Sequence, residues 1–190
     1  LAVLGALSAQ FIRGLANENL SAVLAAGTIE LGNSSGVSLA DPAPAAAAGS
    51  GLRLQALNGL ELGDGSVTIH GYAGTWLSAG SSLQLTGNAD LRVDGALAID
   101  APIISASSTT GSAIQATGLL TVTGGAAGAA APANTGLGAA LAITAADIDF
   151  AGRIVLPSGR SAARYRMGAS SVARVICDCA AAWAAGESVA

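Results

Sequence analysis

Short runs of alternating apolar and polar residues dominate the chain between residues 51 and 108. Leu52 and Leu54 flank Arg53, for example, and the same pattern returns every few residues. Because successive side chains of a strand point to opposite faces, each run predicts a short strand with one buried aliphatic face. Gly, Asn, Asp and Ser interrupt the runs, as in residues 63–66, and these are turn residues. Glycine at this density would cost a helix about 1 kcal/mol per internal position, so the pattern predicts an all-β fold.

The predicted strands also repeat one another. Residues 29–33 (IELGN) recur 31 positions later as residues 60–64 (LELGD). A shorter unit, aliphatic-x-aliphatic followed by a polar residue and then Gly or Ala, occurs at residues 83–87, 91–95, 97–101 and 141–145, and in looser form at 119–124. Units of this size cannot bury an apolar face alone, but stacked units can.

The parity of the apolar positions changes near residue 146. Leu141 and Ile143 share one parity, whereas Ile148 and Phe150 have the other. An inward-facing row changes parity only where the chain bends, so a corner is expected at the small residues between them. The sequence therefore predicts a parallel β-helix, a solenoid with about 20 residues and three short strands per coil, giving roughly six or seven coils. A β-sandwich is the alternative, although it normally has longer strands and some aromatic core.

The chain divides into three parts. Residues 22–159 are predicted to hold the β-helix repeats, with Ala/Gly/Pro-rich loops at 41–50 and 124–136, and residues 1–21 form its N-terminal edge. Residues 160–190 form an atypical tail that contains both cysteines and the single methionine. We expect this tail to come from a shifted or truncated reading frame; the alternative is a helical cap over residues 171–185. The start at leucine suggests a fragment.

Composition excludes several classes of protein. Of 190 residues, 52% are hydrophobic but only 3% are aromatic and 11% charged, under half the roughly 25% charge of a soluble domain. A conventional globular enzyme and a disordered chain are both unlike this. A spanning helix needs about 20 apolar residues, and the best candidate, residues 1–15, is interrupted at Gln10, Arg13 and Gly14. No membrane-spanning segment and no secretory signal are predicted.

Lysine is absent, and five of the eight arginines lie between Arg153 and Arg174. A basic cluster can indicate nucleic acid or an anionic membrane. Here it coincides with the change of composition at the tail, so no nucleic-acid partner is predicted.

The order of the motifs resembles the filamentous haemagglutinin family. The series AGTIELGN, GLRLQALNGLELGDGSVTIHGY, SLQLTGNADLRVDGALAIDAPIISA and LAITAADIDFAGRIVLPSG carries this resemblance over residues 22–159. These proteins are large bacterial exoproteins of two-partner secretion systems, with long right-handed β-helical shafts. The resemblance implies an interior shaft fragment and an extracellular or cell-surface location. It also implies export through an outer-membrane partner barrel, which would act through a secretion domain not found in this sequence.

Few residues suggest catalysis or metal binding. His70 is the only histidine, and because it follows the inward-facing Ile69 it is expected to point to solvent. Cys177 and Cys179 fall short of the four ligands, with wider spacing, that zinc sites generally need. Asp147 and Asp149 share one strand face and are expected to be exposed acids rather than a calcium or acid–base pair. No catalytic, cofactor-binding or metal-binding residue is predicted, and no cofactor.

Two further features invite a functional interpretation. Residues 63–66 (GDGS) are similar to calcium-binding β-roll turns but lack their repeated nonapeptide. Trp76 and Tyr72, close in sequence to Arg53 and His70, would form a sugar-stacking patch if they surface together; core or corner aromatics are the simpler interpretation.

The sequence thus favours a non-enzymatic structural segment of a secreted or surface-exposed adhesin, whose ligand remains open between a host or cell-surface glycan and a protein. The alternative is a β-helical polysaccharide-processing enzyme, which would need acidic and basic side chains to converge in one groove.

Overall fold

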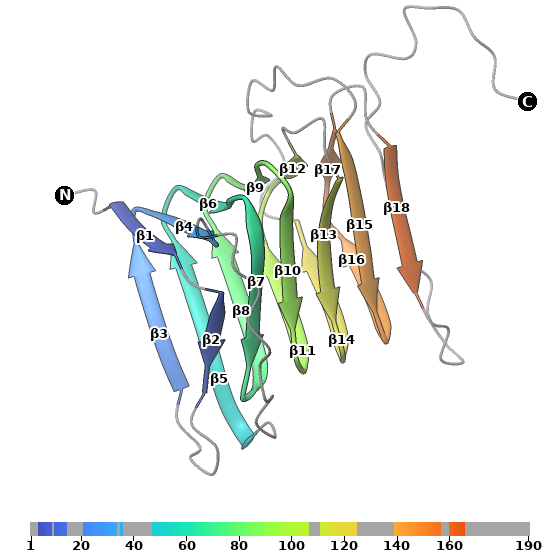
Figure 1. Ribbon diagram of the computed structural model, residues 1–190. Helices are drawn as coiled ribbons and strands as arrows, with labels where there is room; N and C mark the ends of the chain where they lie inside the picture. Colours follow the sequence, from blue (N-terminus) through green and yellow to red (C-terminus); the bar gives the residue numbers. More distant parts are fainter. Residues whose placement is uncertain are drawn as a thin grey trace, which may run out of the picture.

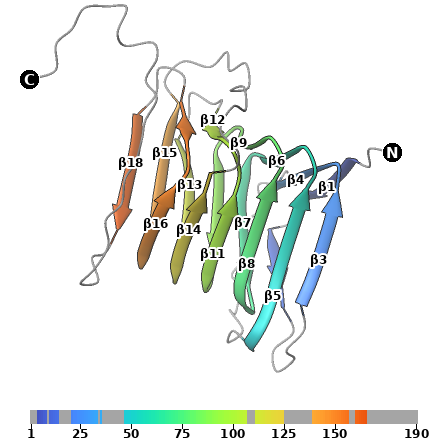
Figure 2. The same cartoon turned by 180° about the vertical axis from the view of Figure 1, so that it is seen from behind.

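The computed structural model describes residues 4–8, 10–14, 21–33, 35, 47–106, 111–124, 139–156 and 160–165. These residues contain strands and turns but no helix. The strands form three six-stranded sheets (Figures 1 and 2). Each sheet runs along the long axis of the molecule, and its strands stack one after another along that axis. Every described strand pair is parallel, which excludes the antiparallel β-sandwich alternative.

Each sheet is named here by its strands. Sheet A consists of β1 (Leu4–Ser8), β4 (Thr28–Gly32), β6 (Gly59–Leu62), β9 (Ser82–Leu85), β12 (Ile104–Ala106) and β17 (Ile154–Val155). Sheet B consists of β2 (Phe11–Arg13), β7 (Gly65–His70), β10 (Ala89–Val93), β13 (Gly111–Ala116), β15 (Ala140–Ala145) and β18 (Arg160–Tyr165). Sheet C consists of β3 (Ser21–Ala26), β5 (Ala47–Ala56), β8 (Tyr72–Ala79), β11 (Ala96–Asp100), β14 (Leu119–Thr123) and β16 (Asp147–Ala151).

The chain passes through the sheets in the constant order A, B, C, and one such passage is called a coil below. Three complete coils follow one another: β6–β7–β8, β9–β10–β11 and β12–β13–β14. Stacked partners in these coils are about one coil length apart, since Leu60 pairs with Leu83 and Leu83 pairs with Ile104. The predicted all-β fold is confirmed, and the arrangement is consistent with a parallel β-helix.

The two repeats found in the sequence have different structural meanings. Residues 29–33 and 60–64 are stacked neighbours, with Ile29 paired to Leu60 and Leu31 to Leu62 in sheet A. The units at 83–87, 91–95 and 97–101 are instead the three consecutive strands β9, β10 and β11, one in each sheet. The shorter repeat therefore marks the three sides of one coil.

Two coils have a side at which no described residue forms a strand. Between β4 and β5 no described strand enters sheet B, and β2 pairs directly with β7. Between β14 and β15 none enters sheet A, and β12 pairs directly with β17. These are the segments in which loops were predicted.

The loop boundaries need a correction. Residues 47–50, predicted as the end of the first loop, belong to β5, and the pairing register with β8 shifts between Ala47 and Gly51. They were missed because AAGS has no apolar–polar alternation, although its backbone can still pair. Residues 41–46 and 125–136 lie outside the described residues.

Paired strands also extend beyond residues 22–159. Strands β1 and β2 join sheets A and B ahead of that range, and β18 pairs with β15 after it. Residues 166–190, with the predicted cap and both cysteines, lie outside the described residues, and the reading-frame hypothesis stays a prediction.

The core lies between the three sheets and consists of aliphatic rows parallel to the axis. In sheet C one row joins stacked residues that are almost fully buried: Leu54, Leu77, Ile99, Val122 and Phe150. Sheet A contributes a matching row of Ile29, Leu60, Leu83, Ile104 and Ile154. Each inward side chain thus has its main neighbours one strand before and one strand after its own.

The predicted corner at residue 146 is confirmed. Strand β15 ends at Ala145 and β16 begins at Asp147, so Ala146 joins sheet B to sheet C. The same corner stacks through successive coils, because the Gly118 amide donates to Gly95 O at 2.9 Å and the Ala146 amide donates to Gly118 O at 3.2 Å. A Cβ on Gly118 would lie 2.9 Å from the Gly95 carbonyl carbon, so the backbone here approaches too closely for a larger residue.

The two ends of the sheet C row differ. Leu24 of β3 occupies the position that stacks on Leu54, yet it is 47% exposed, whereas Phe150 of β16 is 5% exposed. Strand β3 is the edge of its sheet, with no described strand beyond it. Among the described residues, the row is therefore covered less completely at β3 than at β16.

This difference gives a test of the stacking. Leu54→Ala should lower the free energy of unfolding by about 2–5 kcal/mol, because it opens a cavity in a dry row. Leu24→Ala removes the same atoms from a half-exposed position and should cost less than half as much. Chemical denaturation of both variants measures the difference, and equal losses would contradict the row described here.

One inward position of sheet C is polar. Thr75 of β8 stacks between Leu52 and Leu97 and is 1% exposed. Its Oγ1 has no hydrogen-bond partner within the part of the chain that the structure describes. An unsatisfied buried hydroxyl is destabilising, and valine has nearly the same shape.

We therefore expect Thr75→Val to raise the free energy of unfolding by about 1 kcal/mol. Thr144→Val, at an exposed position of β15, is the matched control and should change it by less than about 0.5 kcal/mol. Destabilisation by Thr75→Val would show that the hydroxyl has a partner that matters.

Candidate functional site

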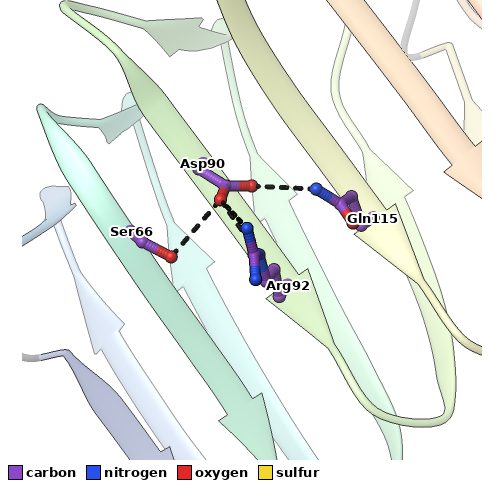
Figure 3. Close-up of polar contacts among 4 residues, drawn as sticks. All are labelled: Ser66, Asp90, Arg92 and Gln115. Atoms are coloured by element: carbon purple, nitrogen blue, oxygen red, sulfur yellow. Dashed lines mark hydrogen bonds and ion pairs between the residues drawn. The ribbon is translucent and has the colours of Figure 1, made fainter. Parts of the chain in front are cut away.

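Four polar side chains meet on the outward face of sheet B (Figure 3). Leu91 and Val93 of β10 face inward, which directs Asp90 and Arg92 outward. Asp90 Oδ2 accepts from Arg92 Nε at 2.9 Å and Nη2 at 2.8 Å, and from Ser66 Oγ at 3.4 Å. Asp90 Oδ1 accepts from Gln115 Nε2 at 3.2 Å.

This network links three adjacent strands, β7, β10 and β13, across the sheet (Figure 3). The Asp90 carboxylate is neutralised by a guanidinium from its own strand and oriented by its neighbours. Both oxygens of this carboxylate already accept hydrogen bonds from protein side chains. The arrangement is therefore suited to stabilising the sheet rather than to acid–base chemistry. The sequence signal was available, since an acid and a base two residues apart on a strand share one face.

The aromatic residues that the sequence grouped together are separated. Tyr72 is 8% exposed, and its hydroxyl donates to Arg13 O at 3.4 Å. Burial raises the pKa of the Tyr72 hydroxyl above its usual value. Trp76 is instead 41% exposed on the outward face of sheet C, with the Arg53 guanidinium 5.6 Å from its ring centroid. The predicted patch therefore reduces to Trp76 and Arg53.

Two glycines make room for the Trp76 indole. A Cβ on Gly51 would lie 2.7 Å from Trp76 Cζ3, and a Cβ on Gly74 would lie 2.9 Å from Cη2. Gly51 and Gly74 are paired partners on β5 and β8, so the outer edge of the indole lies across both strands. The next strand presents only Ala96 and Ala98 beside them. The sequence hid this arrangement because the two glycines are a full coil apart.

Polar residues lie along one side of Trp76 on the same face. Gln55, Ser78 and Asp100 form a row across β5, β8 and β11. Asp100 Oδ1 accepts from Thr123 Oγ1 of β14 at 3.2 Å. This face thus combines an exposed aromatic ring with hydrogen-bonding groups that are within reach of a ligand lying on it.

The prediction for His70 was wrong. His70 is fully buried, although its strand parity is outward as expected. It pairs with Arg13 of β2, and the Phe11 ring lies 6.0 Å away at 55°. The Arg13 guanidinium in turn lies 5.4 Å from the Phe11 ring centroid. The outward face of sheet B is covered at this point, which strand parity cannot reveal.

The acids that the sequence considered and set aside as sites are Asp147, Asp149 and Asp64. Asp149 is exposed and Ile148 between the two acids is buried, which confirms the shared outward face of Asp147 and Asp149. Asp64, in the 63–66 turn, accepts a hydrogen bond from the backbone N–H of Asn88 at 2.8 Å through its side-chain Oδ1. The backbone carbonyl of Asp64 accepts from the backbone N–H of Asn33 at 3.0 Å. This turn carries hydrogen bonds between coils.

A pair of neighbouring acids on sheet A was overlooked. Glu30 and Glu61 are directly paired on β4 and β6, and Thr86 Oγ1 donates to Glu61 Oε1 at 2.9 Å. The 31-residue repeat contained this signal. Over the described ranges no group of three or more His, Cys, Asp or Glu side chains is placed to hold a metal ion. Cys177 and Cys179 lie outside those ranges.

None of the described residues belongs to a helix of the length and apolarity that crossing a bilayer requires. Comparison with protein-family models, with curated proteins and with solved structures found no match.

The Asp90 network predicts a salt-dependent contribution to stability. Asp90→Ala should lower the free energy of unfolding by about 1–2 kcal/mol, because it leaves Arg92, Ser66 and Gln115 without their shared acceptor. Part of this loss should disappear in 1 M NaCl, where exposed charges are screened. Denaturation at low and high salt measures both values. Asp149→Ala, at an exposed position, is the control, and an equal loss there would argue against the network.

Proposed function

We propose that the chain is part of the right-handed parallel β-helical shaft of a large bacterial adhesin, secreted or displayed at the cell surface, with no catalytic activity. The hand follows from a general rule, since connections between parallel strands of one sheet are right-handed in about 98% of cases. The resemblance to filamentous haemagglutinins supports the same assignment through the order of the motifs.

The observation that carries the proposal is the continuity of the buried rows. In each sheet the same inward position is aliphatic in strand after strand, and strands stack at about 4.8 Å intervals. Such a design gains length at constant cross-section with each added coil, which is what a rod that carries a binding surface away from a cell needs. The apolar side chain of Leu24, 47% exposed on the edge strand β3, supports the proposal because one more apolar strand could pack on it.

A polysaccharide-processing enzyme remains the second candidate, because Trp76, Arg53 and Asp100 lie on one sheet face. Such an enzyme needs acidic groups at a defined separation around the scissile bond. Asp100 Oδ1 accepts a hydrogen bond from Thr123 Oγ1. Asp90 lies on a different sheet and forms an ion pair with Arg92, so it does not supply a second acidic group beside Asp100. The shaft is therefore the better-supported function.

Export would proceed through an outer-membrane two-partner-secretion barrel that recognises a domain outside this sequence. The ligand would be a host or cell-surface glycan or protein, and no nucleic acid is involved. The proposal places the chain outside the cell.

Surface labelling tests this proposal. Antibodies raised against the purified 190-residue chain should label intact cells of the source organism, and brief protease treatment of those cells should remove the signal. An antibody against a cytoplasmic protein is the control for lysis. Labelling that requires permeabilised cells would overturn the assignment.

A further inference from the structure

We infer that the outward face of sheet C around Trp76 is a binding site for neutral carbohydrate, which stacks a pyranose ring on the indole. The inference deepens the proposed function and rests on it for its biological setting, but the site itself is defined by side chains of β5, β8 and β11.

Trp76 has an unusual setting for a surface aromatic residue. Its ring covers Gly51 and Gly74, and both glycines are buried although they lie on the outward face. Glycine within a strand weakens it and often marks a place where another group must approach closely. The two glycines allow the indole to lie low across the sheet, so that a ring 41% exposed forms a platform rather than a projecting side chain.

The neighbours of the indole on β11 leave that side of the ring accessible. Ala96 and Ala98 are the residues that β11 places next to Gly74 and Trp76, and neither is long enough to cover the ring. Arg53 comes from the strand on the other side, is exposed, and has its guanidinium over the ring at 5.6 Å from the centroid. A flat ligand can therefore lie on the part of the indole that is exposed beside the Arg53 guanidinium, which can donate to its oxygens.

The row of Gln55, Ser78 and Asp100 supplies the polar groups that a sugar-binding site needs. Gln55 and Ser78 supply donors and acceptors, and Asp100 supplies acceptors, at positions two residues further along the strands than Trp76 and its paired neighbours. Hydroxyl groups around a pyranose ring can bond to such groups while its C–H face rests on the indole. This division between an apolar platform and a few placed polar groups is typical of small-molecule sites.

The charges of the face favour a neutral ligand. Arg53 is the one basic residue on the described outward positions of sheet C, whereas Asp100, Asp147 and Asp149 all point outward there. Asp149 lies in the same row as Trp76, three strands further along the axis, at about 14 Å. A polyanionic chain laid along the face would meet these carboxylates, so repulsion would disfavour it.

The test uses the full 190-residue chain and cellohexaose, maltohexaose, mannohexaose and a galacto-oligosaccharide as probes, with calorimetric titration as the readout. At least one probe should bind saturably. Trp76→Ala should weaken that binding about tenfold or more, and Trp76→Phe should weaken it less. Trp183→Ala, the other tryptophan of the chain, is the matched control and should leave binding unchanged.

A second variant guards against misfolding of Trp76→Ala. Ala98→Gln keeps the indole but places a longer side chain beside it, and it should block binding while circular dichroism stays that of the parent. In a Trp183→Phe background, emission from Trp76 should also change on titration with the bound sugar.

Absence of binding by every neutral probe would overturn the inference, as would binding that Trp76→Ala and Ala98→Gln leave intact. Stronger binding to polygalacturonate or dextran sulfate than to any neutral probe would also overturn it. These outcomes are independent of cell-surface labelling: a labelled chain that binds no sugar refutes only this site, and a sugar-binding chain confined to the cytoplasm refutes only the proposed function.

Discussion

The structure depends on the axial stacking of inward aliphatic side chains. A strand of five residues buries two or three side chains, and the neighbouring strands cover them by presenting apolar residues at the same height. Leu54 lies between Leu24 and Leu77 and is fully buried, whereas Leu24 on the edge strand β3 is half exposed. Stability is therefore a property of neighbouring coils, as in other solenoids.

Stacking also limits what the corners can contain. Where the chain turns from sheet B to sheet C, backbone atoms of successive coils approach until Gly118 has no room for a Cβ, and Gly95 has a φ of 106° that other residues rarely adopt. The sides of the coil are less restricted. When the segment between β4 and β5 contributes no described strand to sheet B, β2 and β7 close the gap by pairing directly. A coil can thus carry an insertion on one side without interrupting the core.

The sequence predicted those features that follow from local alternation. The inward identity of Leu91, Val93, Leu97 and Ile99 and the corner at Ala146 are consequences of period-2 geometry, which a short window contains. The exposure of an outward residue depends instead on what covers the sheet, and this is why His70 was misplaced. Tyr72 and Trp76 share a parity in sequence but not an environment, since Tyr72 is buried and bonded to Arg13 O whereas Trp76 is exposed. The Asp90 network and the Trp76 platform join residues about one coil apart in the sequence. A pattern within a short window of sequence cannot indicate such neighbours.

The division between the two faces of each strand explains where function can reside. Inward positions are fixed by the need to fill a dry and narrow interior, so they carry Leu, Ile, Val and Ala and leave no freedom for chemistry; Thr75 is the polar exception in sheet C. Outward positions are not required to fill the core, and most of them are small or polar. A pair of buried glycines on an outward face is then unexpected, because stability alone would favour residues that prefer strands at Gly51 and Gly74. Their retention is accounted for by the indole that occupies the space, and the indole in turn offers a flat surface that the core does not require. That order of dependence supports the binding role proposed for this face.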